Sequence, residues 1–348
     1  MKIGLIGYPL SGKTTVFNTL TGLHARVDSF ISSGKEANVG LIKVPDKRLD
    51  ALSEIYQPKK ITHAEISFVD LAGITSTSGG GFDANTLTLM RQVEAFTYVV
   101  RAFTSEAVNH PLGRIDPAGD ISGLDQETEL ADLIVIEKRQ SRLEKEGQKS
   151  SPEHTLLERC RESLENSTPL RETGLSEDEL KALSGFGFLS LKPRLILLNT
   201  GEENMAGEPS VAGRFDNLIA FCASVEQQIT ELDPAEQGEF LEAMGIEEPA
   251  REKFIHASYS LLELISFFTV VSNELRAWTV NRGTEAVHAA GKIHSDMERG
   301  FIRAEVVNFE DFIKEPSMAR LKELGKLRLE GKNYIVQDGD IINFRFNV

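Results

Sequence analysis

The chain has 348 residues, 41% of them hydrophobic, and a formal net charge of −15. At roughly 150 residues per domain, this length predicts two or three domains, each with enough hydrophobic residues for a core. The negative charge argues against sequence-independent binding to nucleic acid, which requires a basic face. No apolar stretch reaches the roughly 18 residues of a membrane span, and no basic leader precedes the first apolar run. We therefore expect a cytoplasmic protein that binds neither membranes nor DNA in general.

The first informative segment is Gly7–Thr14, which fits the phosphate-loop pattern G-x-x-x-x-G-K-[ST]. An apolar run at residues 3–6 precedes it, and a helical segment at residues 15–20 follows it. This strand, loop and helix order directs backbone N–H groups and the positive end of the helix toward the phosphates of a nucleotide. We expect Lys13 to reach the outer phosphates and the Thr14 hydroxyl to ligate Mg²⁺. The predicted nucleotide contacts in this segment are Gly7, Leu10, Ser11, Gly12, Lys13, Thr14 and Thr15.

Four apolar, largely non-alternating runs follow one another along the chain with helical segments between them. They lie at residues 3–6, 64–70, 97–102 and 194–198. Such runs are typical of parallel strands that are buried on both faces. We therefore predict an α/β fold with a doubly wound sheet, whose ligands bind at the carboxyl ends of the strands.

The second of these strands ends in the sequence D-x-x-G, formed by Asp70 and Gly73. In a nucleotide site the carboxylate at this position can hold Mg²⁺ through water, and the glycine amide can contact the terminal phosphate. The tetrapeptide alone is weak evidence, and its place at a strand end strengthens it.

Residues 127–190 form long charged helices with apolar residues at helical spacing, interrupted by a turn at residues 147–152. Two antiparallel helices joined there would form a projecting hairpin. The alternative is a helical subdomain packed against the sheet.

The fourth strand is followed by N-x-x-E, where guanine-specific proteins carry N-K-x-D. Asn199 keeps the first position, Thr200 replaces the lysine that covers the base, and Glu202 replaces the aspartate that binds guanine. We therefore predict that strict guanine preference is lost. Cys222, Ala223 and Ser224 are expected to form the last loop on the base side of the site.

From residue 283 the chain contains short β-rich pieces at 301–307, 332–336 and 341–346. An Asp-Gly pair between the last two predicts a hairpin. We therefore divide the chain into a nucleotide-binding domain (1–126 and 191–282), a helical insertion (127–190) and a small α+β domain (283–348).

Taken with these motifs, the sequence resembles the YchF/Obg-like ATPase family, within the Obg group of P-loop NTPases. The resemblance spans nearly the whole chain and is carried by residues 38–40, 44–46, 55–60, 275–279, 293–296, 300–305 and 329–348. It implies that the insertion is a coiled coil and that the C-terminal domain is a TGS domain with a β-grasp fold. It also implies binding and hydrolysis of ATP, often in preference to GTP, and association with the ribosome through its RNA or proteins.

Four positions depart from the family pattern or bear on turnover. Leu10 and Ser11 stand where the family has Asn-Val in its phosphate loop. Gly34 aligns with the threonine that ligates magnesium in the switch segment, so either Ser33 or Ser32 substitutes or the switch no longer closes on the metal. His110 aligns with the histidine that the family uses to position the attacking water, and the alternative is a loop histidine without a role.

The sequence therefore predicts a monomeric, Mg²⁺-dependent P-loop NTPase that binds and hydrolyses ATP, with GTP as a possible substrate, and associates with the ribosome. Lys13 and His110 are its candidate catalytic residues, and Thr14 and Asp70 its candidate metal ligands. The alternative is a non-hydrolysing adaptor that senses a nucleotide and docks partners through its TGS domain. A third hypothesis, a GTP-specific switch, is disfavoured by the N-x-x-E sequence.

Overall fold

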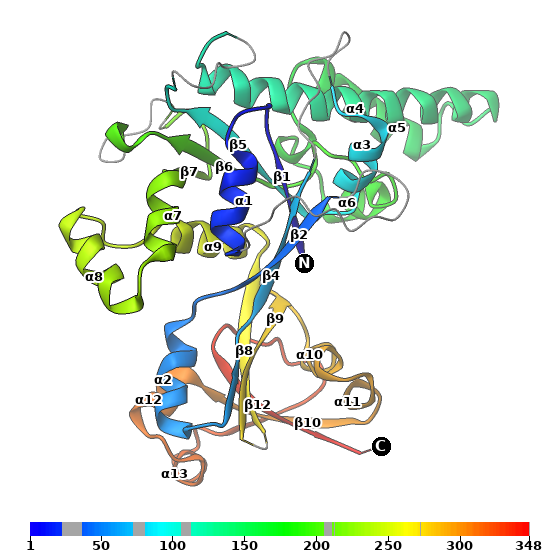
Figure 1. The fold of residues 1–348 in the computed structure, drawn as a ribbon. Helices are drawn as coiled ribbons and strands as arrows, with labels where there is room; N and C mark the ends of the chain where they lie inside the picture. The colour runs from blue at the N-terminus through cyan, green and yellow to red at the C-terminus, as the bar shows by residue number, and fades with distance from the viewer. Residues whose placement is uncertain are drawn as a thin grey trace. The chain divides into compact units, whose positions relative to one another are not determined.

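The computed structural model describes residues 1–22, 37–71, 81–105, 113–204, 211, 213–271 and 273–347. The chain divides into two compact units, coloured along the chain in Figure 1. The first unit contains Met1–Leu41 and Ser67–Ala257, and the second contains Ile42–Ile66 and Ser258–Val348. Each unit is built around its own six-stranded sheet.

The sheet of the first unit has the strand order β2-β4-β1-β5-β6-β7. Its strands are β1 (Lys2–Ile6), β2 (Asn38–Lys43), β4 (Glu65–Asp70), β5 (Ala95–Ala102), β6 (Arg194–Thr200) and β7 (Leu218–Phe221). Strands β4, β1, β5, β6 and β7 pair in parallel, and most of their side chains are buried. This confirms the four apolar runs as buried parallel strands and the doubly wound α/β fold. The strand order reverses beside β1, which places the ligand crevice at the carboxyl end of that strand.

Short helices of the first unit cover this sheet. They are α1 (Lys13–Thr21), α3 (Ala84–Arg91), α7 (Ala223–Glu231), α8 (Pro234–Ala243) and α9 (Ala250–Leu261), the last of which runs on into the second unit. Helix α1 buries Val16, Phe17 and Leu20 completely, at the helical spacing of one apolar face. This packing fixes the direction in which the first turn of α1 points.

The helical insertion contains α4 (Pro117–Lys145) and α5 (Pro152–Glu165), followed by the short helices η1 (Leu170–Glu172) and α6 (Glu177–Leu183). Helices α4 and α5 run side by side in Figure 1 and share a buried seam of Ile136, Leu143, Leu157, Cys160 and Leu164. Helix α4 begins ten residues before the predicted start of the insertion, because Asp116 caps it and Pro117 occupies its first turn. Its first half joins the core of the sheet. The helical hairpin therefore describes the second half of α4 with α5, and the alternative, helices packed against the sheet, describes the first half of α4.

A buried ionic cluster ties the base of α4 to the sheet. The carboxylate of Asp125 accepts hydrogen bonds from Tyr98 Oη on β5 (2.9 Å) and from Arg171 Nη2 (2.7 Å). Arg194 on β6 lies 3.1 Å from the same carboxylate. Removing one partner of such a cluster would leave an uncompensated buried charge. The cluster therefore holds the first half of α4 in a fixed position on the sheet.

The sheet of the second unit has the order β11-β10-β12-β8-β9-β3. Its strands are β3 (Lys60–Thr62), β8 (Leu264–Val271), β9 (Glu274–Asn281), β10 (Phe301–Asn308), β11 (Arg328–Glu330) and β12 (Asp340–Phe346). Its complete helices are α2 (Lys47–Tyr56), α10 (Ala286–Ile293), α11 (Ser295–Arg299), α12 (Phe309–Lys314) and α13 (Met318–Glu323). The predicted domain start at residue 283 therefore differs from the structure, in which 42–66 and 258–282 belong to this unit. The physical reason is that Ile265 and Phe267 of β8 share one core with Ile342 and Phe344 of β12.

The predicted hairpin between residues 332–336 and 341–346 is wrong. Ile335 forms only an isolated bridge to Glu285, and β12 pairs along its length with β10 instead. The Asp-Gly pair has another role, because the carboxylate of Asp338 accepts a hydrogen bond from Ser266 N (2.9 Å) and forms an ion pair with Arg48 (2.9 Å). The turn therefore joins β12 to β8 and α2.

Candidate nucleotide-binding site

The phosphate loop joins β1 to α1 in a conformation that depends on two glycines. A Cβ atom on Gly7 would lie 2.4 Å from Val99 O, and one on Gly12 would lie 2.2 Å from Asn199 Nδ2. Gly12 also has a φ of 87° and is the N-cap of α1. Larger residues at these positions would force the loop away from the sheet. The backbone N–H groups of the first turn of α1 remain available to an anion.

Two buried polar side chains on neighbouring strands hold successive carbonyls of the loop. Asn199 Nδ2 on β6 donates to Ser11 O (3.0 Å), and Arg101 Nη1 on β5 lies 3.5 Å from Leu10 O. Arg101 and Asn199 face each other in the β5–β6 register and are 1% and 4% exposed. The strands therefore position the loop through both residues.

Arg101 and its neighbour Phe103 were not among the residues predicted from the sequence. The guanidinium of Arg101 lies 4.4 Å from the centroid of the Phe103 ring, and its Nε donates to Phe103 O (3.1 Å). Phe103 Cε1 lies 3.9 Å from the position of a Cβ on Gly12. The available signal was an arginine near the end of an otherwise uncharged, apolar strand, because a buried charge there requires a partner or a function.

The candidate catalytic lysine and metal ligand lie together. Lys13 Nζ pairs with Asp70 Oδ1 at the end of β4, and the two side chains are 13% and 7% exposed. Thr14 and Thr15 follow in the first turn of α1 and are exposed. Gly73, His110 and Gly34 lie outside the described residues.

The residues predicted for the base side of the site also lie together. Asn199 Oδ1 accepts a hydrogen bond from Ala223 N (3.4 Å), at the start of α7. Ser224 Oγ donates to Glu202 Oε1 (3.0 Å) and lies 3.3 Å from Cys222 Sγ. The loops after β6 and β7 are therefore joined by side-chain contacts, and Asn199 links both of them to the phosphate loop.

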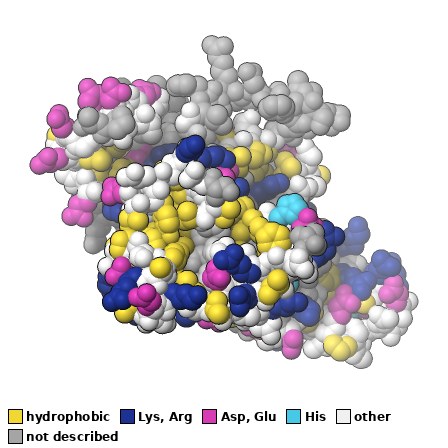
Figure 2. Space-filling model, turned by 90° about the horizontal axis from the view of Figure 1, so that it is seen from below, with side chains coloured by type: hydrophobic (Ala, Val, Ile, Leu, Met, Phe, Trp, Pro, Cys, Tyr) yellow, Lys and Arg dark blue, Asp and Glu magenta, His cyan; other side chains and the backbone are white. Residues whose placement is uncertain are grey.

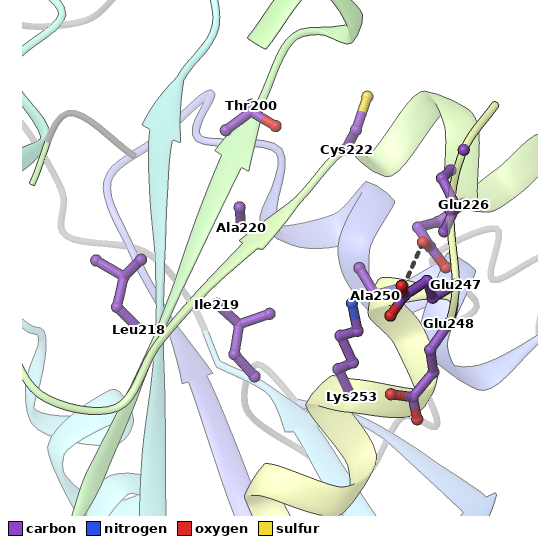
Figure 3. Close-up of a pocket in the computed structure, with 12 residues that line it drawn as sticks. Thr200, Leu218, Ile219, Ala220, Cys222, Glu226, Glu247, Glu248, Ala250 and Lys253 are labelled. Atoms are coloured by element: carbon purple, nitrogen blue, oxygen red, sulfur yellow. Dashed lines mark hydrogen bonds between the residues drawn. The ribbon is translucent and has the colours of Figure 1, made fainter. Parts of the chain in front are cut away.

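A pocket of about 530 Å³ lies beside these loops and is lined in part by Thr200 and Cys222 (Figure 3). Its outer wall is α9, whose first N–H groups donate to the buried carboxylate of Glu226. Burial raises the pKa of Glu226 against the effect of these donors. Figure 3 shows Lys253 of α9 and the acidic segment 247–248 on the same wall. Glu226 therefore caps α9 and fixes this wall next to the base-side loop.

Three features together define a P-loop NTPase domain. They are the sheet order, the glycine-bounded loop between β1 and α1, and the pair formed by Lys13 at the start of α1 and Asp70 at the end of β4. Comparisons with known proteins agree. Residues 2–141 match the family model described as 50S ribosome-binding GTPase, and residues 264–347 match the YchF-GTPase C-terminal model, described as a protein of unknown function.

Relatives over the full length specify the family. The Ribosome-binding ATPase YchF of Haemophilus influenzae is 41% identical, and the alignment covers 100% of this chain and 99% of the relative. The Ribosome-binding ATPase YchF of Bacillus subtilis is 40% identical over 100% of both chains. The structure of the Schizosaccharomyces pombe YchF GTPase superposes with a TM-score of 0.87 at 27% identity, covering 99% of this chain and 97% of that one. The chain belongs to the YchF family, which confirms the resemblance found in the sequence.

Proposed function

We propose that this protein binds and hydrolyses ATP and associates with the ribosome. The choice of ATP over GTP rests on the N-x-x-E sequence after β6. Its glutamate, Glu202, accepts a hydrogen bond from Ser224 on the base-side loop. The relatives named above are called ribosome-binding ATPases, which supports the same assignment.

The first step is binding of the triphosphate by the phosphate loop. Lys13 is paired with Asp70 in the structure, so we infer that the lysine transfers to the outer phosphates when the nucleotide enters. That transfer frees the carboxylate of Asp70 at the position where a P-loop NTPase holds its metal. Loop amides and the positive end of α1 bind the remaining phosphate charge.

The oxygen donors near the outer phosphates suit Mg²⁺. The hydroxyl of Thr14 and the carboxylate of Asp70 would hold it, since Mg²⁺ takes hydroxyl, carboxylate and phosphate oxygens. Bound Mg²⁺ would neutralise charge on the β- and γ-phosphates. Lys13 and the loop amides supply the same electrostatic stabilisation from the protein.

The base-side loops support a preference for adenine. Guanine recognition requires a carboxylate that accepts two hydrogen bonds from the base, and Glu202 is one methylene longer than the aspartate that does so. Glu202 also shares a hydrogen bond with Ser224. Thr200 is too short to cover the base in place of a lysine stem. Together these substitutions weaken guanine selectivity and leave ATP as the proposed substrate.

For hydrolysis, we propose that His110 orients the water that attacks the terminal phosphate, with Lys13 stabilising the developing charge. A second candidate function is a nucleotide-sensing adaptor that does not hydrolyse its nucleotide, and Gly34 in the switch segment supports it. Phosphate release over many turnovers that disappears in Lys13→Ala would exclude the adaptor.

The proposed partners are ATP and the ribosome, through ribosomal RNA or protein. We propose a cytoplasmic monomer that binds neither membranes nor DNA in general. In the part of the chain that the structure describes, none of the helices combines the length and hydrophobicity that a membrane crossing requires. The insertion at 127–190 and a TGS domain near the C-terminus are the proposed docking elements.

Isothermal titration calorimetry tests the choice of nucleotide. Nucleotide-free protein is titrated with non-hydrolysable ATP and GTP analogues in Mg²⁺ and then in EDTA. We expect tighter ATP binding that requires Mg²⁺, and a Glu202→Asp variant in which GTP gains affinity relative to ATP. Glu203→Asp shortens the neighbouring carboxylate and serves as the matched control. GTP binding that is about tenfold tighter than ATP binding in the native protein would refute the proposal.

A further inference from the structure

A groove of about 360 Å³ lies on one face of the sheet of the second unit. Its walls come from α10 and α11 and from strands β8, β9 and β12. The side chains that matter here are Val271, Arg276, Trp278, Ile293, Met297 and Phe346. The pairing of Thr269 with Arg276 and of Phe267 with Trp278 places these strand residues on one face. Helices α10 and α11 leave this end of the face uncovered.

The rim of the groove exposes large hydrophobic side chains. Val271 is 56% exposed and Phe346 is 39% exposed. Hydrophobic side chains gather beside Lys and Arg on the face of the molecule shown in Figure 2. Covering such side chains with another chain gains roughly 25 cal/mol per Å² of apolar surface, which favours a ligand with hydrophobic groups of its own.

Arg276 supplies a positive charge inside this hydrophobic groove. Its guanidinium lies 3.8 Å from the centroid of the Trp278 ring, and no carboxylate of the described residues pairs with it. Glu274 also lines the groove, where it accepts a hydrogen bond from Thr62 (2.7 Å) and pairs with Lys60 (3.0 Å). These two contacts, together with the positive charge of Arg276, lower the pKa of Glu274, so it stays ionised. A guanidinium held flat on an indole presents its remaining donors to a carboxylate.

The same contacts argue against stacking of a nucleobase in the groove. Arg276 covers the Trp278 ring, Phe267 stacks beside it at 6.5 Å, and Trp278 Nε1 donates to Thr269 Oγ1 (2.9 Å). A base would have to displace Arg276 to reach the indole face. A peptide needs no such displacement, since its carboxylate binds the exposed edge of the guanidinium.

We propose that this groove binds a peptide segment of a partner protein in which hydrophobic side chains lie next to carboxylates. The hydrophobic side chains pack against Val271, Phe346 and Met297, and a carboxylate pairs with Arg276. The guanidinium of Arg276 complements a carboxylate of such a segment, even though the chain as a whole carries −15. The proposed partner is thus a protein.

Fluorescence anisotropy with the full-length protein tests this proposal. The probe is a labelled octapeptide in which Leu and Phe alternate with Asp. Two control peptides replace Asp with Lys, or Leu and Phe with Ser, and a labelled single-stranded RNA octamer is the nucleic-acid control. We expect binding of the first peptide with a dissociation constant below about 100 µM, and at least about tenfold weaker binding of both control peptides and of the RNA.

Two variants and two matched controls locate the binding. Arg276→Gln removes the charge and Val271→Asp makes the rim acidic, and each should weaken binding about tenfold or more. Arg303→Gln removes an exposed arginine on β10, and Leu329→Asp changes a side chain that is 58% exposed on β11, against 56% for Val271. These controls should change the affinity less than about twofold. Thermal melting confirms that all four variants fold.

Absence of peptide binding at 100 µM would overturn the proposal. Equal binding by Arg276→Gln, Val271→Asp and the native protein would also overturn it, because the peptide would then bind elsewhere. RNA binding that is tighter than peptide binding and is lost in the same two variants would replace the proposed peptide with a nucleic acid.

Discussion

Leu10 provides a quantitative test of how the phosphate loop is built. It has a φ of 63°, in the left-handed region, although it is not a glycine. This conformation costs a residue with an ordinary side chain about 1–2 kcal/mol, and asparagine tolerates it better because its side chain hydrogen-bonds locally. The side chain of Leu10 is 54% exposed, so replacing it sacrifices little buried surface. We therefore expect Leu10→Asn to raise the free energy of unfolding of the first unit by about 1 kcal/mol.

Differential scanning calorimetry measures this effect. For a unit of this size, 1 kcal/mol corresponds to a rise in Tm of roughly 2–4 °C. The relevant transition is the one that added nucleotide shifts upward, because a ligand stabilises the unit that binds it. Leu130→Asn is the matched control, since Leu130 is 55% exposed and lies within helix α4 of the same unit, where its backbone is helical. It should not raise that transition.

Two results would refute this reasoning. If Leu10→Asn leaves the Tm unchanged or lowers it, then the left-handed leucine stores no strain that asparagine relieves. If Leu130→Asn raises the same transition equally, then the gain comes from the polarity of asparagine and not from the backbone conformation.

Three further predictions concern single side chains. Lys13→Ala should weaken ATP binding by about a hundredfold, measured by calorimetric titration, because it removes the cation that is expected to bind the outer phosphates. Arg101→Gln should weaken ATP binding about tenfold and adenosine binding much less, since Arg101 acts on the phosphate loop; equal losses would contradict this role. Burial raises the pKa of Asp132 to about 6, so the folded state holds a proton that the unfolded state releases. The free energy of unfolding should therefore fall as the pH rises from about 4 to about 6, and urea titrations of Asp132→Asn should show a smaller fall.

Much of the geometry of the candidate site was predictable from the sequence because its residues follow local rules. A phosphate loop must lie between a strand and a helix, and a carboxylate directly after a buried strand must lie at the ligand edge of a parallel sheet. Lys13 and Asp70 lie together for this reason. Arg101 was not predictable in the same way, because its role depends on the register that places it opposite Asn199 on the next strand.

The second unit shows a different limit. The sequence analysis placed residues 264–281 in the nucleotide-binding domain, whereas in the structure they belong to the second unit. The hairpin predicted at the C-terminus failed because Asp338 binds Ser266 and Arg48, which are distant in sequence. Local turn signals predict a turn, and tertiary contacts decide which strands it connects.

Asn199 shows why the first letter of N-x-x-E carries little information about the base. Its amide nitrogen donates to Ser11 O and its amide oxygen accepts from Ala223 N, so both ends of the side chain connect loops of the protein. A site for adenine needs that connection as much as a site for guanine does, because the connection positions the phosphate loop. We therefore propose that discrimination between the bases comes from the other positions, Thr200 and Glu202. This is why Glu202→Asp, and not a substitution of Asn199, is the change that tests base preference without disturbing the phosphate loop.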